Sequence, residues 1–183
     1  MAKQGKRPIG IPKGVNISME SGGLNISGSQ GTLNFAIPSS VSVTVEKDRV
    51  QVGFSGMEKP ENLRGLVHAL IRHRLKCVTE GITKKLEVVG VGYQAEVKGK
   101  DLVLKVGFSH SVPMEVPEGL KVKIEKSIIA ITGIDPEKVG DFAAKVRAVR
   151  PPEPYGGKGI RYFGEYVRHK VGKTAGVGVT PSA

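Results

Sequence analysis

Residues 37–47 read Ile37-Pro38-Ser39-Ser40-Val41-Ser42-Val43-Thr44-Val45-Glu46-Lys47. At a shift of 79 residues the same pattern returns as Val116-Pro117-Glu118-Gly119-Leu120-Lys121-Val122-Lys123-Ile124-Glu125-Lys126. In both copies apolar residues alternate with polar ones between a proline and a Glu-Lys pair, which predicts a half-buried strand followed by a turn. Two copies of one such unit indicate an internal duplication.

A helical pattern follows each copy. After Pro60, apolar residues recur at helical spacing and a helix is predicted to end near Gly81; the apolar positions are Leu63, Leu66, Val67, Leu70 and Ile71. The second helix begins with Asp135 as N-cap before Pro136, and stops at Arg150 because prolines follow. In the repeat, Pro60, Leu63, Leu66 and Leu70 correspond to Pro136, Val139, Phe142 and Val146. The outer face of the first helix carries Arg64, His68, Arg72 and Lys76, which is either a solvated face or a secondary contact with phosphate.

Further alternating segments predict strands around these two units. Two of them, with Val15, Ile17 and Met19 and with Leu24 and Ile26, are joined by a turn at Ser21-Gly22-Gly23. A third contains Leu33, Phe35 and Ile37, and a fourth, with Val50, Val52 and Phe54, is predicted to pair in a hairpin with Val41, Val43 and Val45. In the second half a strand contains Leu102, Leu104 and Val106. We therefore expect an α+β fold of two duplicated modules, each an antiparallel β-sheet packed on one face by an α-helix. The expected boundaries are a basic arm at 1–13, a first module at 14–82, a second at 83–150, and a basic, Gly/Pro-rich segment and tail at 151–183.

The positive charge of the chain is confined to two segments. Net charge is +11, of which residues 145–173 contribute +6 and residues 1–13 contribute +4, so the rest is close to neutral. The centre of the second segment is Pro151-Pro152-Glu153-Pro154-Tyr155-Gly156-Gly157-Lys158-Gly159-Ile160-Arg161-Tyr162, whose prolines and glycines argue against any regular helix or strand. Four of the nine aromatic residues also lie between 145 and 173. This distribution favours an anionic partner, with folded RNA recognised by its shape and backbone ahead of DNA or an anionic membrane.

Other chemistry has little support in the sequence. The glycines of Gly90-Val91-Gly92-Tyr93-Gln94-Ala95 lead into a strand rather than the helix that a dinucleotide site needs, so a bend is predicted there. Gly172-Lys173-Thr174 lacks the first glycine of a phosphate loop. Cys77 is the only cysteine and the four histidines have no metal-ligand spacing. We expect no enzymatic activity, metal, cofactor or small-molecule substrate, and no apolar run long enough to span a membrane.

Three segments resemble one known family. They are similar to ribosomal protein L6 of the large subunit, bacterial or organellar type. The first is the central C-terminal sequence above. The other two are the N-terminal Gly5-Lys6-Arg7-Pro8-Ile9-Gly10-Ile11-Pro12-Lys13-Gly14-Val15 and the segment Thr79-Glu80-Gly81-Ile82-Thr83-Lys84-Lys85-Leu86-Glu87-Val88-Val89-Gly90-Val91-Gly92-Tyr93-Gln94-Ala95. The resemblance covers residues 5 to about 175, in family order. It implies a structural protein that binds large-subunit (23S-type) rRNA near the stalk base, beside neighbouring ribosomal proteins and the translation-factor site, in the cytoplasm or an organellar matrix. The alternative is a DNA-associated architectural protein.

Charge and resemblance together predict a set of RNA contacts. In the arm and at the end of the second helix these are Lys3, Lys6, Arg7, Arg147 and Arg150. In the family signature and the basic run after it they are Tyr155, Lys158, Arg161, Tyr162, Arg168, His169, Lys170 and Lys173. The family usually has lysine where this chain has Gly156, so one cation fewer is available here.

Overall fold

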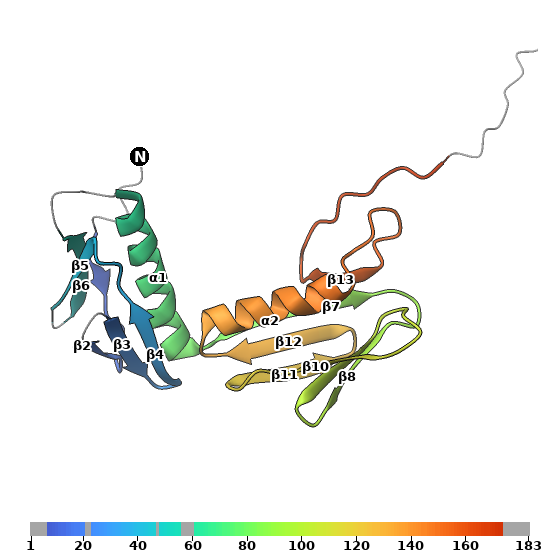
Figure 1. The fold of residues 1–183 in the computed structure, drawn as a ribbon, viewed down its shortest axis with the longest axis horizontal. Helices are drawn as coiled ribbons and strands as arrows, with labels where there is room; N and C mark the ends of the chain where they lie inside the picture. Colours follow the sequence, from blue (N-terminus) through green and yellow to red (C-terminus); the bar gives the residue numbers. More distant parts are fainter. Residues whose placement is uncertain (1–6, 21–22, 47, 56–60, 174–183) are drawn as a thin grey trace, which may run out of the picture. The chain divides into compact units, whose positions relative to one another are not determined.

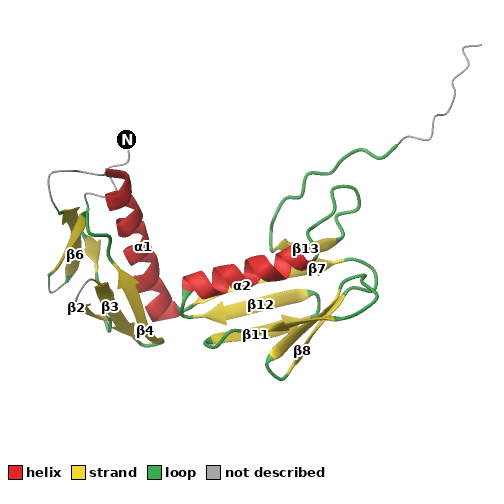
Figure 2. Cartoon of the chain, viewed as in Figure 1, coloured by secondary structure: helices red, strands yellow, loops and turns green. Residues whose placement is uncertain are grey.

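The computed structural model describes residues 7–20, 23–46, 48–55 and 61–173 (Figure 1). Several predicted features lie outside these ranges: the contacts Lys3 and Lys6, part of the turn at Ser21-Gly22, Lys47 of the first Glu-Lys pair, and Pro60 at the start of the first helix. The described chain contains two helices and thirteen strands (Figure 2).

The first module contains six strands and one long helix. Their bounds are β1 Ile9–Gly10, β2 Asn16–Glu20, β3 Gly23–Gly28, β4 Gly31–Ala36, β5 Val41–Val45, β6 Arg49–Phe54 and α1 Glu61–Glu80. The strands form two three-stranded sheets, β2-β3-β4 and β1-β6-β5. The predicted hairpin is confirmed, because β5 and β6 pair antiparallel with Val43 opposite Val52. Alternation of small polar and β-branched residues fits these strands, since one face of each sheet is buried.

The second module repeats this arrangement and adds one strand. Its elements are β7 Ile82–Val89, β8 Gln94–Lys98, β9 Asp101–Lys105, β10 Val112–Glu115, β11 Leu120–Glu125, β12 Ile128–Gly133, α2 Pro136–Val149 and β13 Gly159–Tyr162. The sheet β8-β9-β10 corresponds to β2-β3-β4, and β11-β12-β7 corresponds to β5-β6-β1. The predicted α+β class with duplicated modules is therefore confirmed. In the described chain only the second module has a fourth strand, β13, on the outer edge of β7.

The ends of the helices follow the predicted capping residues. The Asp135 side chain accepts a hydrogen bond from the backbone N–H of Glu137 at 2.9 Å, at the start of α2. At the end of α1, Gly81 has a φ of +74° and its N–H donates to the carbonyl of Cys77 at 2.8 Å. Both contacts satisfy backbone groups that a helix end would otherwise leave unpaired.

The buried face of α1 matches the predicted one except at Leu66 and His68, because Val67 and Ile71 are buried and Leu63 and Leu70 pack partly buried against the core. Leu66 is 53% exposed, whereas the helix buries Val67, Ile71, Leu75 and Val78 against β3, β4 and β6. Leu66 and Phe142, which the repeat places at matching positions, therefore differ in burial, since Phe142 is 3% exposed. His68, predicted on the outer face, is 8% exposed. Leu66 lies at the edge of the apolar face, so spacing alone could not decide whether the sheet covers it.

The structure confirms the prediction for one glycine-rich segment and corrects it for another. At Gly90 and Gly92 the predicted bend is confirmed, because the chain turns there between β7 and β8 with φ values of +150° and +77°. The C-terminal stretch is a correction: its last four residues form β13, although no regular strand is predicted there. Pairing with the free edge of β7 outweighs the weak propensity of that glycine-led segment.

Contacts divide the described chain into two compact units. One contains the chain up to Thr83 with 117–121 and 131–141, and the other contains 84–116, 122–130 and the chain from Phe142 onward. The core of the first unit is apolar and includes Leu24, Ile26 and Val50, each at most 1% exposed. Neither described helix is apolar enough over a sufficient length to cross a bilayer.

Candidate nucleic-acid interface

The C-terminal segment (residues 150–173) begins where α2 ends, because Pro151 has no N–H group with which to continue the helix. The chain then folds back, and the N–H of Ile160 donates to the carbonyl of Arg150 at 2.8 Å. Gly159 makes this approach possible: its φ is +143°, and a Cβ there would lie 2.6 Å from the Pro151 carbonyl oxygen. Residues 150–160 therefore form a closed loop that requires glycine at its base.

The tip of this loop is a hydrogen-bonded turn. The N–H of Glu153 donates to the carbonyl of Lys158 at 2.9 Å, and the N–H of Gly157 donates to the carbonyl of Glu153 at 3.0 Å. Gly157 has a φ of +68°, which favours glycine. Tyr155 and Lys158 are both exposed on this turn. The turn thus fixes the backbone and leaves these two side chains in solvent.

Strand β13 fastens the return limb of the loop to the second module. It pairs antiparallel with β7, with Ile160 opposite Val88. The Ile160 side chain is fully buried, and the N–H of Phe163 extends the attachment with a 3.0 Å hydrogen bond to the carbonyl of Lys85. Burying one such side chain contributes about 1.5–3 kcal/mol, so this strand is a firm anchor.

A second anchor is the ion pair between Arg147 of α2 and Glu165. Two guanidinium nitrogens donate to the carboxylate at 3.1 and 2.6 Å, and the same carboxylate accepts the N–H of Tyr162 at 2.9 Å. The hydrogen bond from Arg147 holds the pKa of Glu165 below its ordinary value, and the same bond raises the pKa of Arg147. The Arg147 guanidinium also lies over the Tyr162 ring, 5.7 Å from its centroid.

Two further arginines among the predicted RNA contacts, Arg161 and Arg150, contact side chains of the second module. Arg161 donates to the carboxylate of Glu87 on β7 at 2.9 Å. The guanidinium carbon of Arg150 lies 5.5 Å from the ring centroid of Phe108. Together with Arg147, these side chains fasten the segment to the module, which is a role that charge counting does not reveal.

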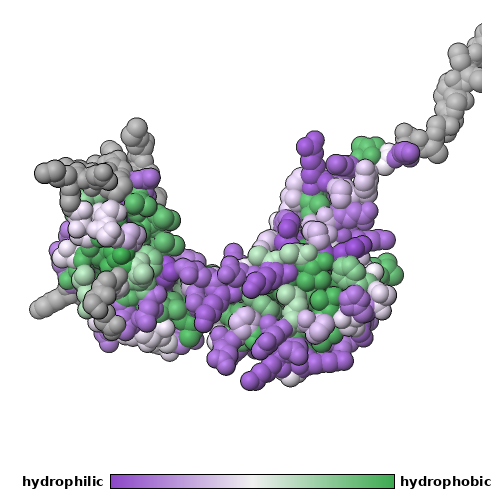
Figure 3. Space-filling view, viewed as in Figure 1, coloured by the Kyte–Doolittle hydropathy of each residue, from purple (hydrophilic) through white to green (hydrophobic). Residues whose placement is uncertain are grey.

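The basic run after β13 returns to the turn. The N–H of Lys170 donates to the carbonyl of Pro154 at 2.8 Å. The ring of His169 lies near Gly157, with its Cε1 atom 3.4 Å from where a Cβ would stand. The structure thus brings His169 and Lys170 back to the turn that carries Lys158, and all three residues are exposed, as are Arg168 and Lys173. Figure 3 shows hydrophilic side chains over this segment with a few hydrophobic ones between them.

Two exposed aromatic residues of the segment are absent from the predicted contacts. Phe163 is 61% exposed and Tyr166 is 87% exposed. Large aromatic side chains left in solvent beside cations are typical of surfaces that stack on unpaired bases. Their position between Arg161 and Arg168 is the sequence signal that could have identified them.

The N-terminal contact Arg7 belongs to the other compact unit. Its side chain is exposed, and its carbonyl accepts a hydrogen bond from Nε2 of His68 at 3.1 Å. Among the described residues there is no group of three or more His, Cys, Asp or Glu side chains placed to hold a metal ion. Cys77 is buried, and burial raises the pKa of its thiol.

The fold and this segment define a class of protein: a duplicated α+β chain that presents cations on a clasped Pro- and Gly-rich C-terminal segment. A family model described as "Ribosomal protein L6" matches residues 89–163. Proteins named "Large ribosomal subunit protein uL6" are similar over nearly the whole chain. The one from Thermosynechococcus vestitus is 44% identical over 95% of this chain and 98% of its own length, and the one from Protochlamydia amoebophila is 45% identical over 96% and 98%. The chain belongs to the ribosomal protein L6 family, which confirms the resemblance noted in the sequence.

Proposed function

We propose that the chain is a structural constituent of the large ribosomal subunit and binds large-subunit (23S-type) rRNA through its C-terminal segment. Membership of the ribosomal protein L6 family supports the first part of this proposal. The second part depends on the geometry of residues 150–173. A role in the ribosome fits a chain in which residues 1–13 and 145–173 carry nearly all of the net positive charge.

The observation that carries the proposal is a group of exposed cations on the anchored loop and in the run that follows β13: Lys158, Arg168, Lys170 and Lys173. Among the described residues, none of these four side chains forms an ion pair with a carboxylate. They are available to replace the counterions of RNA phosphates, which makes binding favourable and salt-dependent. Because the loop and β13 already hold the backbone around Lys158, less conformational entropy is lost there on binding.

The other predicted contacts divide by role. Tyr155, exposed on the turn, suits stacking or backbone contact with RNA. Arg147, Arg150 and Arg161 position the segment, since each contacts a side chain of the same module. We further propose, on the family resemblance, that the bound rRNA lies near the stalk base and translation-factor site. Neighbouring ribosomal proteins complete that surrounding, and the role of the chain is structural rather than enzymatic.

Sedimentation and competition experiments test this function. The purified chain, incubated with large subunits from which it has been stripped, is expected to sediment with them at high magnesium. It is also expected to prefer large-subunit rRNA to duplex DNA of equal length at fixed salt. Equal affinity for the two nucleic acids would instead favour the alternative of a DNA-associated architectural protein. Failure to sediment with the subunit would contradict the ribosomal role.

A further inference from the structure

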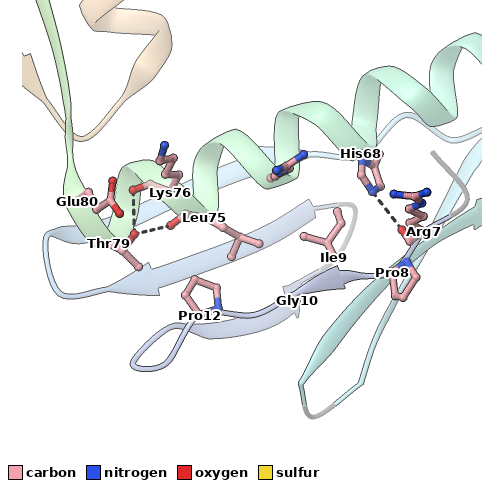
Figure 4. Close-up of a pocket in the computed structure, with 11 residues that line it drawn as sticks. Arg7, Pro8, Ile9, Gly10, Pro12, His68, Leu75, Lys76, Thr79 and Glu80 are labelled. Atoms are coloured by element: carbon pink, nitrogen blue, oxygen red, sulfur yellow. Dashed lines mark hydrogen bonds between the residues drawn. The ribbon is translucent and has the colours of Figure 1, made fainter. Parts of the chain in front are cut away.

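The first module contains a pocket at the place where the second module has β13. The pocket lies between β1 and α1 and has a volume of about 480 Å³ (Figure 4). In the second module the strand that corresponds to β1 is β7, and its outer edge is covered by β13. Within the described chain β1 is the outermost strand of its sheet, so the corresponding edge stays open. The duplication thus explains why a pocket exists here.

The pocket has an apolar floor and a cationic rim. Ile9 and Leu75 are buried on the floor, and the buried imidazole of His68 binds the carbonyl of Arg7 (Figure 4). The rim carries three exposed cations, Arg7, Arg72 and Lys76, against one carboxylate, Glu80. Among the described residues, no ion pair joins any of the three cations to a carboxylate. The local excess of +2 favours an anionic occupant.

Pairing with another protein strand is unfavourable at this edge. Ile9 pairs with Val50, and the N–H of Ile11 donates to the carbonyl of Asp48. The backbone groups of Ile9 and Ile11 therefore point toward β6, and those of the alternate residues point away from the sheet, into the open edge. The outward residues are Pro8, Gly10 and Pro12, and two of these have no N–H group to donate. Prolines on an exposed edge prevent the addition of a strand. The N–H of Gly10 remains, and a Cβ added to Gly10 would contact nothing within 4 Å, so there is room for a ligand.

We propose that this pocket binds the phosphate backbone of large-subunit rRNA, as a second contact separate from the C-terminal segment. The inference rests on the proposed function. Arg72 and Lys76 are one helical turn apart, a spacing of roughly 5–6 Å between Cβ atoms, which lets two cations follow successive groups of a polyanion. The outward N–H of Gly10 and the Arg7 guanidinium complete a set of donors suited to phosphate oxygens.

The direct test removes the two rim cations of α1 in the full-length chain. Arg72→Gln/Lys76→Gln keeps good helix formers at both exposed positions, so melting should not change by more than about 1 °C. Lys121→Gln/Lys123→Gln is the matched control, because both lysines are exposed on β11, outside the pocket and outside residues 150–173. The measured quantity is affinity for protein-free large-subunit rRNA across a salt series.

Loss of two phosphate contacts should make the slope of log K against log salt shallower by about 1.4–1.8, which weakens binding about 25- to 60-fold near 0.1 M salt. The control should change the slope by much less. If both double variants bind alike while Lys158→Ala weakens binding, the pocket proposal is wrong and the proposed function stands. If the wild-type chain shows no salt-dependent binding to rRNA, the proposed function itself fails.

A proximity experiment gives an independent readout. Ala69 is exposed on α1, one turn before the pocket cations, and can be changed to cysteine in a Cys77→Ala background to carry an iron chelate. Hydroxyl radicals from this site should cleave large-subunit rRNA at positions different from those cleaved by a chelate at Lys158→Cys. An absence of cleavage from position 69, with normal cleavage from position 158, would overturn the proposal. Loss of subunit incorporation by the pocket variant with unchanged rRNA affinity would overturn it too, because it would indicate an acidic protein partner.

Discussion

Gly156→Lys should strengthen RNA binding, because it adds a cation on the exposed turn beside Lys158. Gly156 lies on the turn at the tip of residues 150–160, next to Gly157 and Lys158. A Cβ at position 156 would make only ordinary contacts, the nearest at 3.7 Å to a carboxylate oxygen of Glu153, and its φ lies outside the left-handed region. The backbone therefore accepts lysine without strain, and the new ammonium group reaches solvent beside Lys158.

The size of the effect follows from counterion release. One additional phosphate contact steepens log K against log salt by about 0.7–0.9, which corresponds to roughly 5- to 8-fold tighter binding at 0.1 M salt and about 2.5-fold at 0.3 M. Stability should be unchanged or raised by a few tenths of a kcal/mol, since glycine loses more freedom on folding than lysine does at a compatible position. Pairing of the new lysine with Glu153 would bring the affinity gain to the low end of this range.

Filter binding to large-subunit rRNA over a salt series measures both the affinity and the slope. Gly156→Gln separates charge from bulk, and its slope should equal that of the unchanged chain. Gly140→Lys, in α2 at a position where a Cβ meets nothing within 4 Å, adds the same charge outside residues 150–173 and should leave the slope nearly unchanged. If Gly156→Lys and Gly156→Gln have the same slope, no phosphate approaches position 156 and the proposed contact surface is misplaced.

Four further substitutions, one of them with a matched control, test the attachment and the charge of the C-terminal segment. Gly159→Ala should destabilise the second module by roughly 2–4 kcal/mol, since its Cβ would lie 2.6 Å from the Pro151 carbonyl oxygen, whereas Gly156→Ala should be neutral in the same urea titration. Glu165→Gln should lower stability by at most about 1 kcal/mol near neutral pH, because the ion pair with Arg147 is partly exposed. The pKa of Glu165 is lowered in the folded state, so this stabilisation is present above the ordinary glutamate pKa and is lost as pH falls through the folded-state pKa. The difference in melting temperature between Glu165→Gln and the unchanged chain should therefore vanish in acid. A difference that persists in acid would contradict the ion pair as its cause. Lys158→Ala should weaken rRNA binding without changing the melting temperature, while Arg161→Ala should also lower the melting temperature, because it leaves Glu87 without its partner.

Local patterns predicted the elements whose causes are local. The hairpin of β5 and β6 was readable because one face alternates Val41, Val43 and Val45, and period-two burial follows from the pleat of a strand. The start of α2 was readable because Asp135 and Pro136 suit the N-cap and first helical positions. The duplication could be predicted because both modules have similar residues at the same spacing in their strands and turns.

Contacts distant in sequence decided what spacing could not. The Gly159–Tyr162 segment became β13 because the edge of β7, whose paired residues lie 70 to 76 positions earlier, was available for pairing. Likewise Arg147 and Arg161 counted as free cations in the sequence, although each meets a carboxylate in the fold. Charge content is a property of the sequence, but which charges stay unpaired is a property of the packed chain.

The sequence by itself determined the α+β class, the duplication and the concentration of charge in two segments, since these depend on periodicity, turn residues and composition. Only the tertiary structure decided that Leu66 is exposed and His68 buried on α1, which arginines anchor the C-terminal segment, and why the first module retains an open pocket beside β1. The physical reason is that burial and pairing depend on the surface that meets each residue, and that surface is formed by residues distant along the chain.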